Sequence, residues 1–159
     1  MMRGASVAVL AALTALAACK TERDPDPLVE RAAFGVFFGG QIQDRKELPF
    51  ELDPGKQQQG FRVDFHQALA SSVPVHWEIA RPLSGKSAKV DGGASVTEVG
   101  DLSAREGETR LDVPISLRQG QVLGNWHVRL SVATRVVLDR DVLVFDARER
   151  RERERDAGR

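Results

Sequence analysis

The sequence predicts a single all-β domain, an antiparallel β sandwich of about seven strands, with a cleaved signal peptide before it and a charged tail after it. Apolar and polar residues alternate with a period of two between residues 33 and 146, as in strands with one buried face. Turn signals such as Asp53-Pro54-Gly55 and Asp91-Gly92-Gly93 separate these runs, and no amphipathic helix is apparent before residue 147. A small β barrel is the alternative architecture.

The first element in chain order is an export segment. Arg3 is the lone charge ahead of an apolar or small run from residue 4 to residue 18, and charged residues such as Lys20 and Glu22 follow it. A helix that crosses a membrane needs about 20 apolar residues, so this run is too short for a permanent anchor. The pattern is typical of a secretory signal that covers residues 1–18.

The end of this segment resembles the bacterial lipobox, which is an aliphatic residue, two small residues and a cysteine, here Leu16-Ala17-Ala18-Cys19. Cys19 is the only cysteine of the chain. The resemblance implies that its sulfur carries diacylglycerol and that the mature protein begins at Cys19, held on a membrane by lipid. Lys20 stands where an aspartate would signal inner-membrane retention, which favours the outer membrane, facing the periplasm. Ordinary cleavage after Ala15-Leu16-Ala17 is the alternative, and it would release a soluble protein.

A tether and then the strands follow the lipidated cysteine. The tether completes residues 19–32, and residues 20–27 of it are charged and interrupted by two prolines. The domain covers residues 33–146, in which strands are expected near residues 34–42, 61–65, 73–80, 95–99, 111–117, 126–132 and 136–145. Trp77 and Trp126 both face the core in this register.

The last two predicted strands carry a resemblance to known domains. Residues 124–130, GNWHVRL, and the apolar runs at 136–138 and 142–144 resemble the last hairpin of immunoglobulin-like and fibronectin-type-III-like domains. Trp77 on an earlier strand would suit the core tryptophan of such sandwiches. The chain lacks the cysteine pair of antibody domains, which excludes immunoglobulin proper and leaves the broader immunoglobulin-like sandwich class.

The histidines define a candidate interaction surface on the strands around the two tryptophans. By alternation, His66, His76 and His127 point away from the core. If the strands of Trp77 and Trp126 are neighbours, His76 and His127 lie side by side on the outer face, with Glu78 and Arg129 next to them. A metal site there would need a third or fourth ligand, and Glu78 is the only further candidate ligand that the sequence provides there. Surface histidines most often simply face water, so we expect no metal site, and part of a protein interface is the alternative to a plain solvated surface.

Other motifs argue against catalysis, nucleotides and nucleic acids. Gly85-Lys86-Ser87 ends like a P-loop, but Ala80 stands where its first glycine belongs, and an exported protein meets no ATP. The sequence contains no Gly-x-Ser-x-Gly elbow and no His-Glu-x-x-His motif. Lys plus Arg and Asp plus Glu both number 23, so no overall positive field favours nucleic acid. We expect no enzyme activity and no cofactor.

Two segments remain. Gly39-Gly40, inside the first strand pattern, indicates a strand kink, and a loop shaped to receive a ligand is the alternative. The tail, residues 147–159, is charged and either disordered or transiently helical. Together these observations predict an envelope lipoprotein that is a non-catalytic binding or accessory module for another envelope protein. The alternative is a periplasmic lipoprotein that binds a glycan or a metal.

Overall fold

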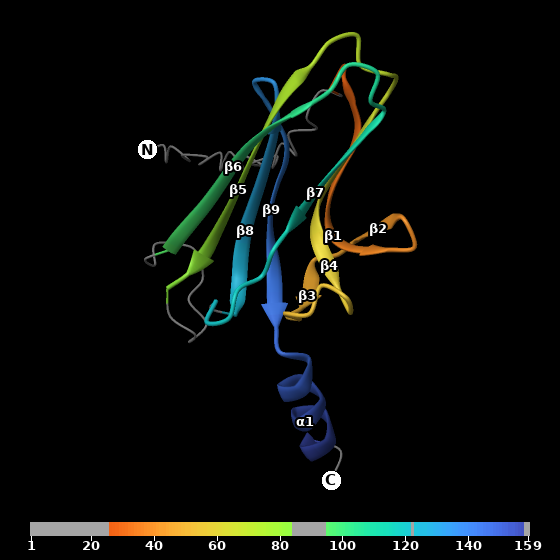
Figure 1. Cartoon of the computed structure of the whole chain (residues 1–159). Coiled ribbons are helices and arrows are strands. Elements are labelled where there is room, and N and C mark those ends of the chain that lie inside the picture. The colour runs from red at the N-terminus through yellow and green to blue at the C-terminus, as the bar shows by residue number, and fades with distance from the viewer. Residues whose placement is uncertain (1–25, 84–94, 122, 158–159) are drawn as a thin grey trace, which may run out of the picture.

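The described part of the chain folds as a two-layer β sandwich with a helix at its C-terminal end (Figure 1). The computed structural model describes residues 26–83, 95–121 and 123–157. Sheet A has the order β2-β1-β4-β7, and sheet B has the order β3-β9-β8-β5-β6. In chain order the strands are β1 (Val29–Phe38), β2 (Gln41–Asp44), β3 (Glu47–Pro49), β4 (Gln58–Phe65), β5 (Val73–Pro82), β6 (Ser95–Ala104), β7 (Arg110–Ile115), β8 (Gly124–Val132) and β9 (Arg135–Phe145).

The strand order is that of an immunoglobulin-like sandwich. The row β1-β4-β7 corresponds to strands A, B and E of that fold, and the row β9-β8-β5-β6 corresponds to G, F, C and C′. The described strands form two separate sheets and do not close into a barrel. The predicted class is therefore confirmed, and the barrel alternative is not what the chain forms.

Two short strands add to the seven that the sequence predicts. β2 and β3 have four and three residues, too few for alternation to reveal them. β3 is also an exception to the antiparallel arrangement, because it pairs in parallel with β9. Together β2 and β3 carry the chain from the β1 edge of sheet A to the neighbouring β9 edge of sheet B.

The first strand begins earlier and ends earlier than predicted. Val29 already pairs with Phe65 of β4 and is buried, although the sequence placed residues up to 32 in the tether. The strand ends at Phe38, because Gly39 and Gly40 have φ angles of 56° and 74° and form a two-residue hairpin turn into β2. Positive φ at both central residues is the requirement of a type I′ hairpin turn, and glycine meets it without steric cost. The expected kink inside one strand is therefore wrong.

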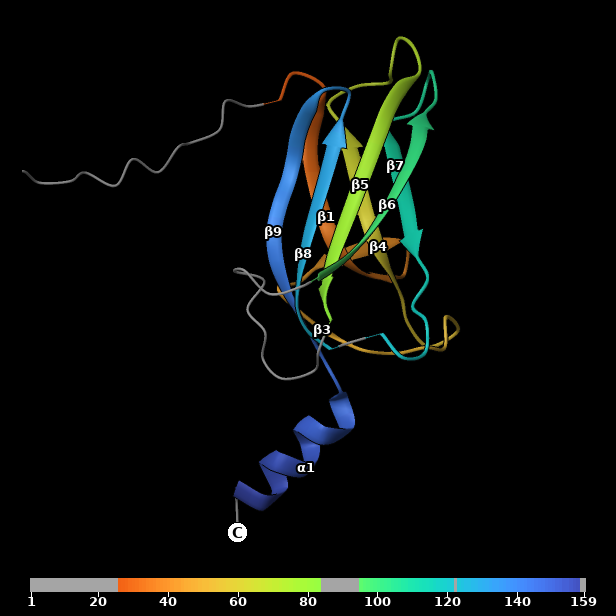
Figure 2. The same ribbon diagram turned by 90° about the vertical axis from the view of Figure 1, so that its left-hand side faces the viewer.

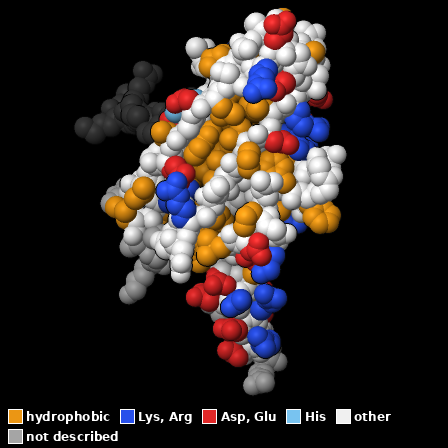
Figure 3. Space-filling view, in the orientation of Figure 1, with side chains coloured by type: hydrophobic (Ala, Val, Ile, Leu, Met, Phe, Trp, Pro, Cys, Tyr) orange, Lys and Arg blue, Asp and Glu red, His pale blue; other side chains and the backbone are white. Residues whose placement is uncertain are grey.

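The core lies between the two sheets and follows the predicted alternation. Phe34, Phe61 and Trp126 are completely buried, and the Phe34 and Phe61 rings lie 4.6 Å apart. Trp77 also faces inward, where a Cβ on Gly100 of the neighbouring strand would lie 2.4 Å from its Cε2 atom. Glycine at position 100 thus leaves room for the indole ring. Figure 3 shows that apolar side chains reach the surface on the open side of the sandwich, between β6 and β7.

Helix α1 (Ala147–Ala157) continues from β9 and projects from the lower end of the sandwich (Figure 1). Its charged side chains of both signs lie at the surface (Figure 3). Arg150 connects the helix to the domain, since its Nη1 donates to Glu47 at 2.7 Å and its guanidinium lies 4.7 Å from the Phe145 ring centre. In the described part of the chain, no helix has the length and apolar character needed to cross a membrane.

Candidate functional site

The strand register brings the four predicted interface residues onto the outer face of sheet B, which Figure 2 shows in front. Glu78 of β5 lies opposite Arg129 of β8, whereas His76 lies opposite Ser131 and His127 lies opposite Ala80. The two histidines therefore share a face, but the Glu78 and Arg129 row separates them. The expectation that they lie side by side is wrong, because the antiparallel register offsets them by four residues along β5.

Aspartates of the outer strands complete this surface. His76 Nδ1 lies 2.7 Å from Asp101 of β6, and its Nε2 lies 3.2 Å from Glu78. His127 contacts Asp139 and Asp141 of β9 at 2.9 Å each, and Arg129 Nη2 donates to Asp139 at 2.9 Å. We call the set the sheet B face: His76, Glu78, Asp101, His127, Arg129, Asp139 and Asp141. It contains four carboxylates and one guanidinium, so it is acidic whenever its histidines are neutral.

The carboxylates change the ionisation of His76. Hydrogen bonds with Asp101 and then Glu78 raise the pKa of His76 above its usual value, against a smaller opposing effect of desolvation. The positive form of the ring is stabilised because it can donate from both nitrogens. His76 therefore lowers the net negative charge of the sheet B face at a higher pH than an isolated histidine would.

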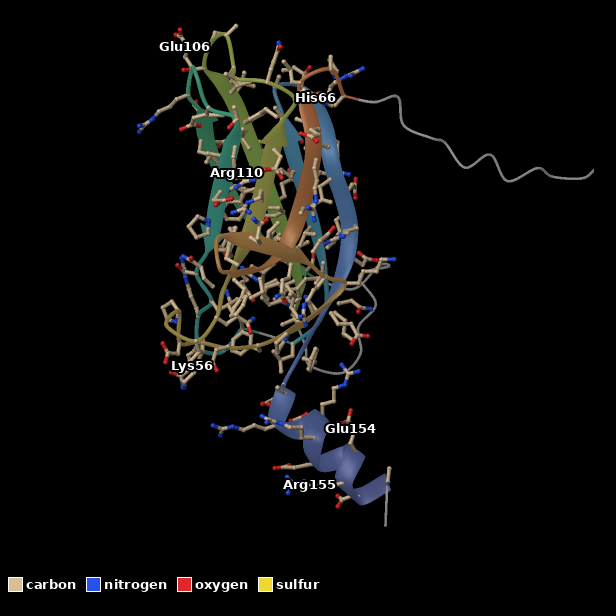
Figure 4. All side chains as sticks on the ribbon, turned by 90° about the vertical axis from the view of Figure 1, so that its right-hand side faces the viewer. Lys56, His66, Glu106, Arg110, Glu154 and Arg155 are labelled. Carbon is tan, nitrogen blue, oxygen red and sulfur yellow. The ribbon has the colours of Figure 1, made fainter. Side chains whose placement is uncertain are left out.

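The sheet B face includes neither a metal site nor His66, and the two sequence motifs considered above lie outside the described residues. Within the described ranges, no group of three or more His, Cys, Asp or Glu side chains is arranged to hold a metal ion. His66 is exposed at the end of β4, where Figure 4 labels it, and lies away from the sheet B face. The lipobox residues up to Cys19, and Gly85-Lys86-Ser87, lie outside the described residues.

A second surface, on the outer face of sheet A, was missed by the sequence analysis. The β1–β2 hairpin lies across this face, below Arg110 in Figure 4. Its tip is held by Arg62 of β4, whose Nη1 donates to the Gly40 carbonyl at 3.0 Å. The same guanidinium is bidentate to Asp112 of β7, with Nε and Nη2 donating at 2.6 and 2.7 Å. Arg62 is only 3% exposed, although its position in the alternation faces outward.

A cavity of about 360 Å³ lies beside this ion pair; we call it the hairpin pocket. Its lining, apart from the two hairpin glycines, consists of Phe37, Phe38, Gln58, Arg62, Asp112 and Pro114. Gly60 lies between Gln58 and Arg62 on β4, and a Cβ there would lie 2.1 Å from the Val113 carbonyl oxygen. Phe38 is 73% exposed, the largest fraction among the described large apolar side chains. The pocket thus combines an exposed aromatic ring with a buried ion pair.

One sequence signal for this site was available. A Gly-Gly pair between two runs of residues with strand character is a hairpin signal, and it would have predicted the turn between β1 and β2. The burial of Arg62 has no local signal, because it arises from a hairpin that folds over a strand about 20 residues later in the chain.

Comparison with known proteins gives a likeness of fold to a solved structure. No family model and no curated protein matches the sequence. A solved structure of an immunoglobulin-like protein from Pseudomonas aeruginosa superposes with a TM-score of 0.48 and 16% identity, over 74% of this chain and 94% of that protein.

Proposed function

We propose that this chain is a lipid-anchored protein of the bacterial envelope whose β sandwich binds another envelope protein and performs no catalysis. The lipobox resemblance at Leu16-Ala17-Ala18-Cys19 supports the location, and the tether after it leaves the sandwich free to meet a partner. The sheet B face is the observation that supports protein binding.

The sheet B face has two properties of a binding surface. Its charged side chains already hold one another at 2.7 to 3.2 Å, so a partner need not order them and the entropy cost of association is smaller. Exposed apolar side chains, Val99, Val136 and Leu143, accompany the charged groups on the same sheet. Such a mixture of apolar contact and fixed polar groups is common at non-obligate interfaces.

The charge of the sheet B face indicates the kind of partner. Four carboxylates against one guanidinium favour a surface that presents lysine or arginine. Complementary charge accelerates encounter and selects the partner more than it adds affinity. Binding should therefore weaken as ionic strength rises, because the Debye length falls to about 3 Å at 1 M salt.

The test is mild crosslinking in membranes followed by purification of the full chain. We expect the wild-type protein to return a reproducible partner, and the charge reversals Asp101→Lys and Asp141→Lys to lose it. Both side chains are well exposed, at 82% and 67%, so the fold should tolerate them. Glu106→Lys is the matched control, because it reverses an exposed charge in the loop after β6, at the upper end of the sandwich and outside the sheet B face (Figure 4).

Two results would contradict the proposal. Repeated recovery of the lipoprotein alone from wild-type membranes would remove the claim of a protein partner. Equal loss of the partner in Glu106→Lys and in the two sheet B variants would show that total charge matters and that the sheet B face does not.

A further inference from the structure

The hairpin pocket on sheet A is a separate site from the sheet B face, and its construction indicates a ligand class. Its lining includes an ion pair in which the buried Arg62 is bidentate to Asp112. Hydrogen bonding to Asp112 raises the pKa of the Arg62 guanidinium above its usual value, so Arg62 stays positively charged beside the carboxylate. The pair therefore carries no net charge.

A neutral ion pair disfavours charged ligands. An anion drawn to Arg62 would meet the Asp112 carboxylate, and a cation drawn to Asp112 would meet the guanidinium. A ligand that both donates and accepts hydrogen bonds has no such conflict. Hydroxyl and amide groups are of this kind.

The polar groups of the pocket retain hydrogen-bonding capacity for such a ligand. Arg62 has five N–H donors and gives three of them to Asp112 and the Gly40 carbonyl. The Asp112 carboxylate has about four acceptor positions, and Arg62 occupies two of them. Gln58, which also lines the pocket, has an amide that can donate and accept. The lining of the cavity thus offers both donors and acceptors.

Phe38 supplies an apolar surface beside these polar groups. Its ring is 73% exposed and belongs to the lining of the pocket. The face of an aromatic ring is electron-rich, and it packs against polarised C–H groups as well as other apolar surface. A pyranose ring offers both requirements, since one face presents C–H groups and the rim presents hydroxyls. The cavity volume of about 360 Å³ lies near the lower limit of ligand pockets, about 300 Å³, which suits a single ring.

We propose that the hairpin pocket binds an uncharged sugar unit of a glycan, with Phe38 stacked on the ring and Arg62, Asp112 and Gln58 bonded to its hydroxyl or amide groups. This site is independent of the protein partner proposed for the sheet B face. A lipid-anchored protein that holds both would contact a polysaccharide with one sheet and a protein with the other.

The test is retention of the full, detergent-solubilised chain on insoluble glycans, namely chitin, cellulose and purified peptidoglycan, with a soluble oligosaccharide of the retaining glycan as competitor. We expect at least one of these to retain the wild-type protein. Phe38→Ser and Gln58→Glu should each weaken the affinity by about tenfold or more. Val96→Ser is the matched control, because it removes an exposed apolar side chain, 50% exposed, from β6 of the opposite sheet, where neither proposed binding surface includes it. Unchanged melting temperatures establish that the variants are folded.

Several outcomes would overturn the glycan assignment. One is that no glycan retains the wild-type chain, and another is that Phe38→Ser binds as tightly as Val96→Ser. If Phe38→Ser instead abolishes a protein crosslink while no glycan is retained, the pocket is a protein-docking site. The reversals Asp101→Lys and Asp141→Lys should leave glycan retention unchanged, which separates this proposal from the one for the sheet B face.

Discussion

Replacing Asp112 by alanine is expected to lower the free energy of unfolding by about 3 kcal/mol. The change leaves Nε and Nη2 of Arg62 without the carboxylate that accepts from them at 2.6 and 2.7 Å. Removal of one partner of a buried ion pair costs about 3 to 5 kcal/mol, because the other charge stays buried. Asp112 itself is 41% exposed, so water can enter where it stood, and the lower end of that range applies.

The same two strands carry a matched control. Asp64 of β4 pairs with Arg110 of β7, and Arg110 Nε donates to it at 2.7 Å. Arg110 is 48% exposed and can return to solvent once the carboxylate is gone. Asp64→Ala should therefore cost less than about 1 kcal/mol. The contrast between the two variants isolates burial, because the sheet and the type of cross-strand pair are the same.

Urea unfolding of the full chain, followed by tryptophan fluorescence, measures both effects, since Trp126 is completely buried. In thermal unfolding, a loss of 3 kcal/mol corresponds to a fall of about 6 to 12 °C in melting temperature. The double variant Arg62→Leu with Asp112→Val should recover most of the stability, because it leaves no unpaired charge. Equal losses for Asp112→Ala and Asp64→Ala would refute the reasoning that burial of Arg62 decides the cost.

Two further predictions concern the anchor and the sheet B face. Cys19→Ala should abolish incorporation of labelled fatty acid and move the protein from the membrane to the soluble fraction; unchanged membrane retention would refute the lipoprotein assignment. His76→Asn should reduce the pH dependence of stability, by less than about 1 kcal/mol because the ring is partly exposed. The pKa of folded His76 is raised, so its stabilising contribution is complete below about pH 6.5 and is lost as the pH rises through the folded pKa. Identical pH profiles of unfolding for wild type and His76→Asn would contradict the assigned contacts with Asp101 and Glu78.

Alternation predicted the sandwich well because it is a local property. Residues such as Val75, Ile79 and Val128 face the core as their position in each run requires. The same rule placed His76, Glu78, His127 and Arg129 on one outer face, where the structure has them. It could not give the offset between the two histidines, because the register between β5 and β8 depends on how the sheets pack.

The hairpin pocket was beyond such reasoning for a different reason. Alternation assigns Arg62 to the outer face of β4, and that assignment is correct. Arg62 is buried because the hairpin tip folds back over the sheet, where the Gly40 carbonyl accepts a hydrogen bond from the Arg62 guanidinium. A contact between segments about 20 residues apart has no signature in the periodicity of either one. The aspartates that engage the histidines were missed for the same reason, since Asp101, Asp139 and Asp141 belong to strands other than those of the histidines.

The start of β1 and helix α1 lie at opposite ends of the sandwich, as both ribbon views show (Figures 1 and 2). If lipid holds the chain at Cys19, the six residues between it and Asp26 reach at most about 25 Å when extended. The upper end of the domain then stays near the bilayer, and strands of 10 and 11 residues carry α1 about 35 Å farther away. The arginines of the helix are thus directed away from the membrane that holds the lipid. With a lipid anchor at Cys19, α1 would therefore be the part of the domain that reaches farthest from the anchoring membrane.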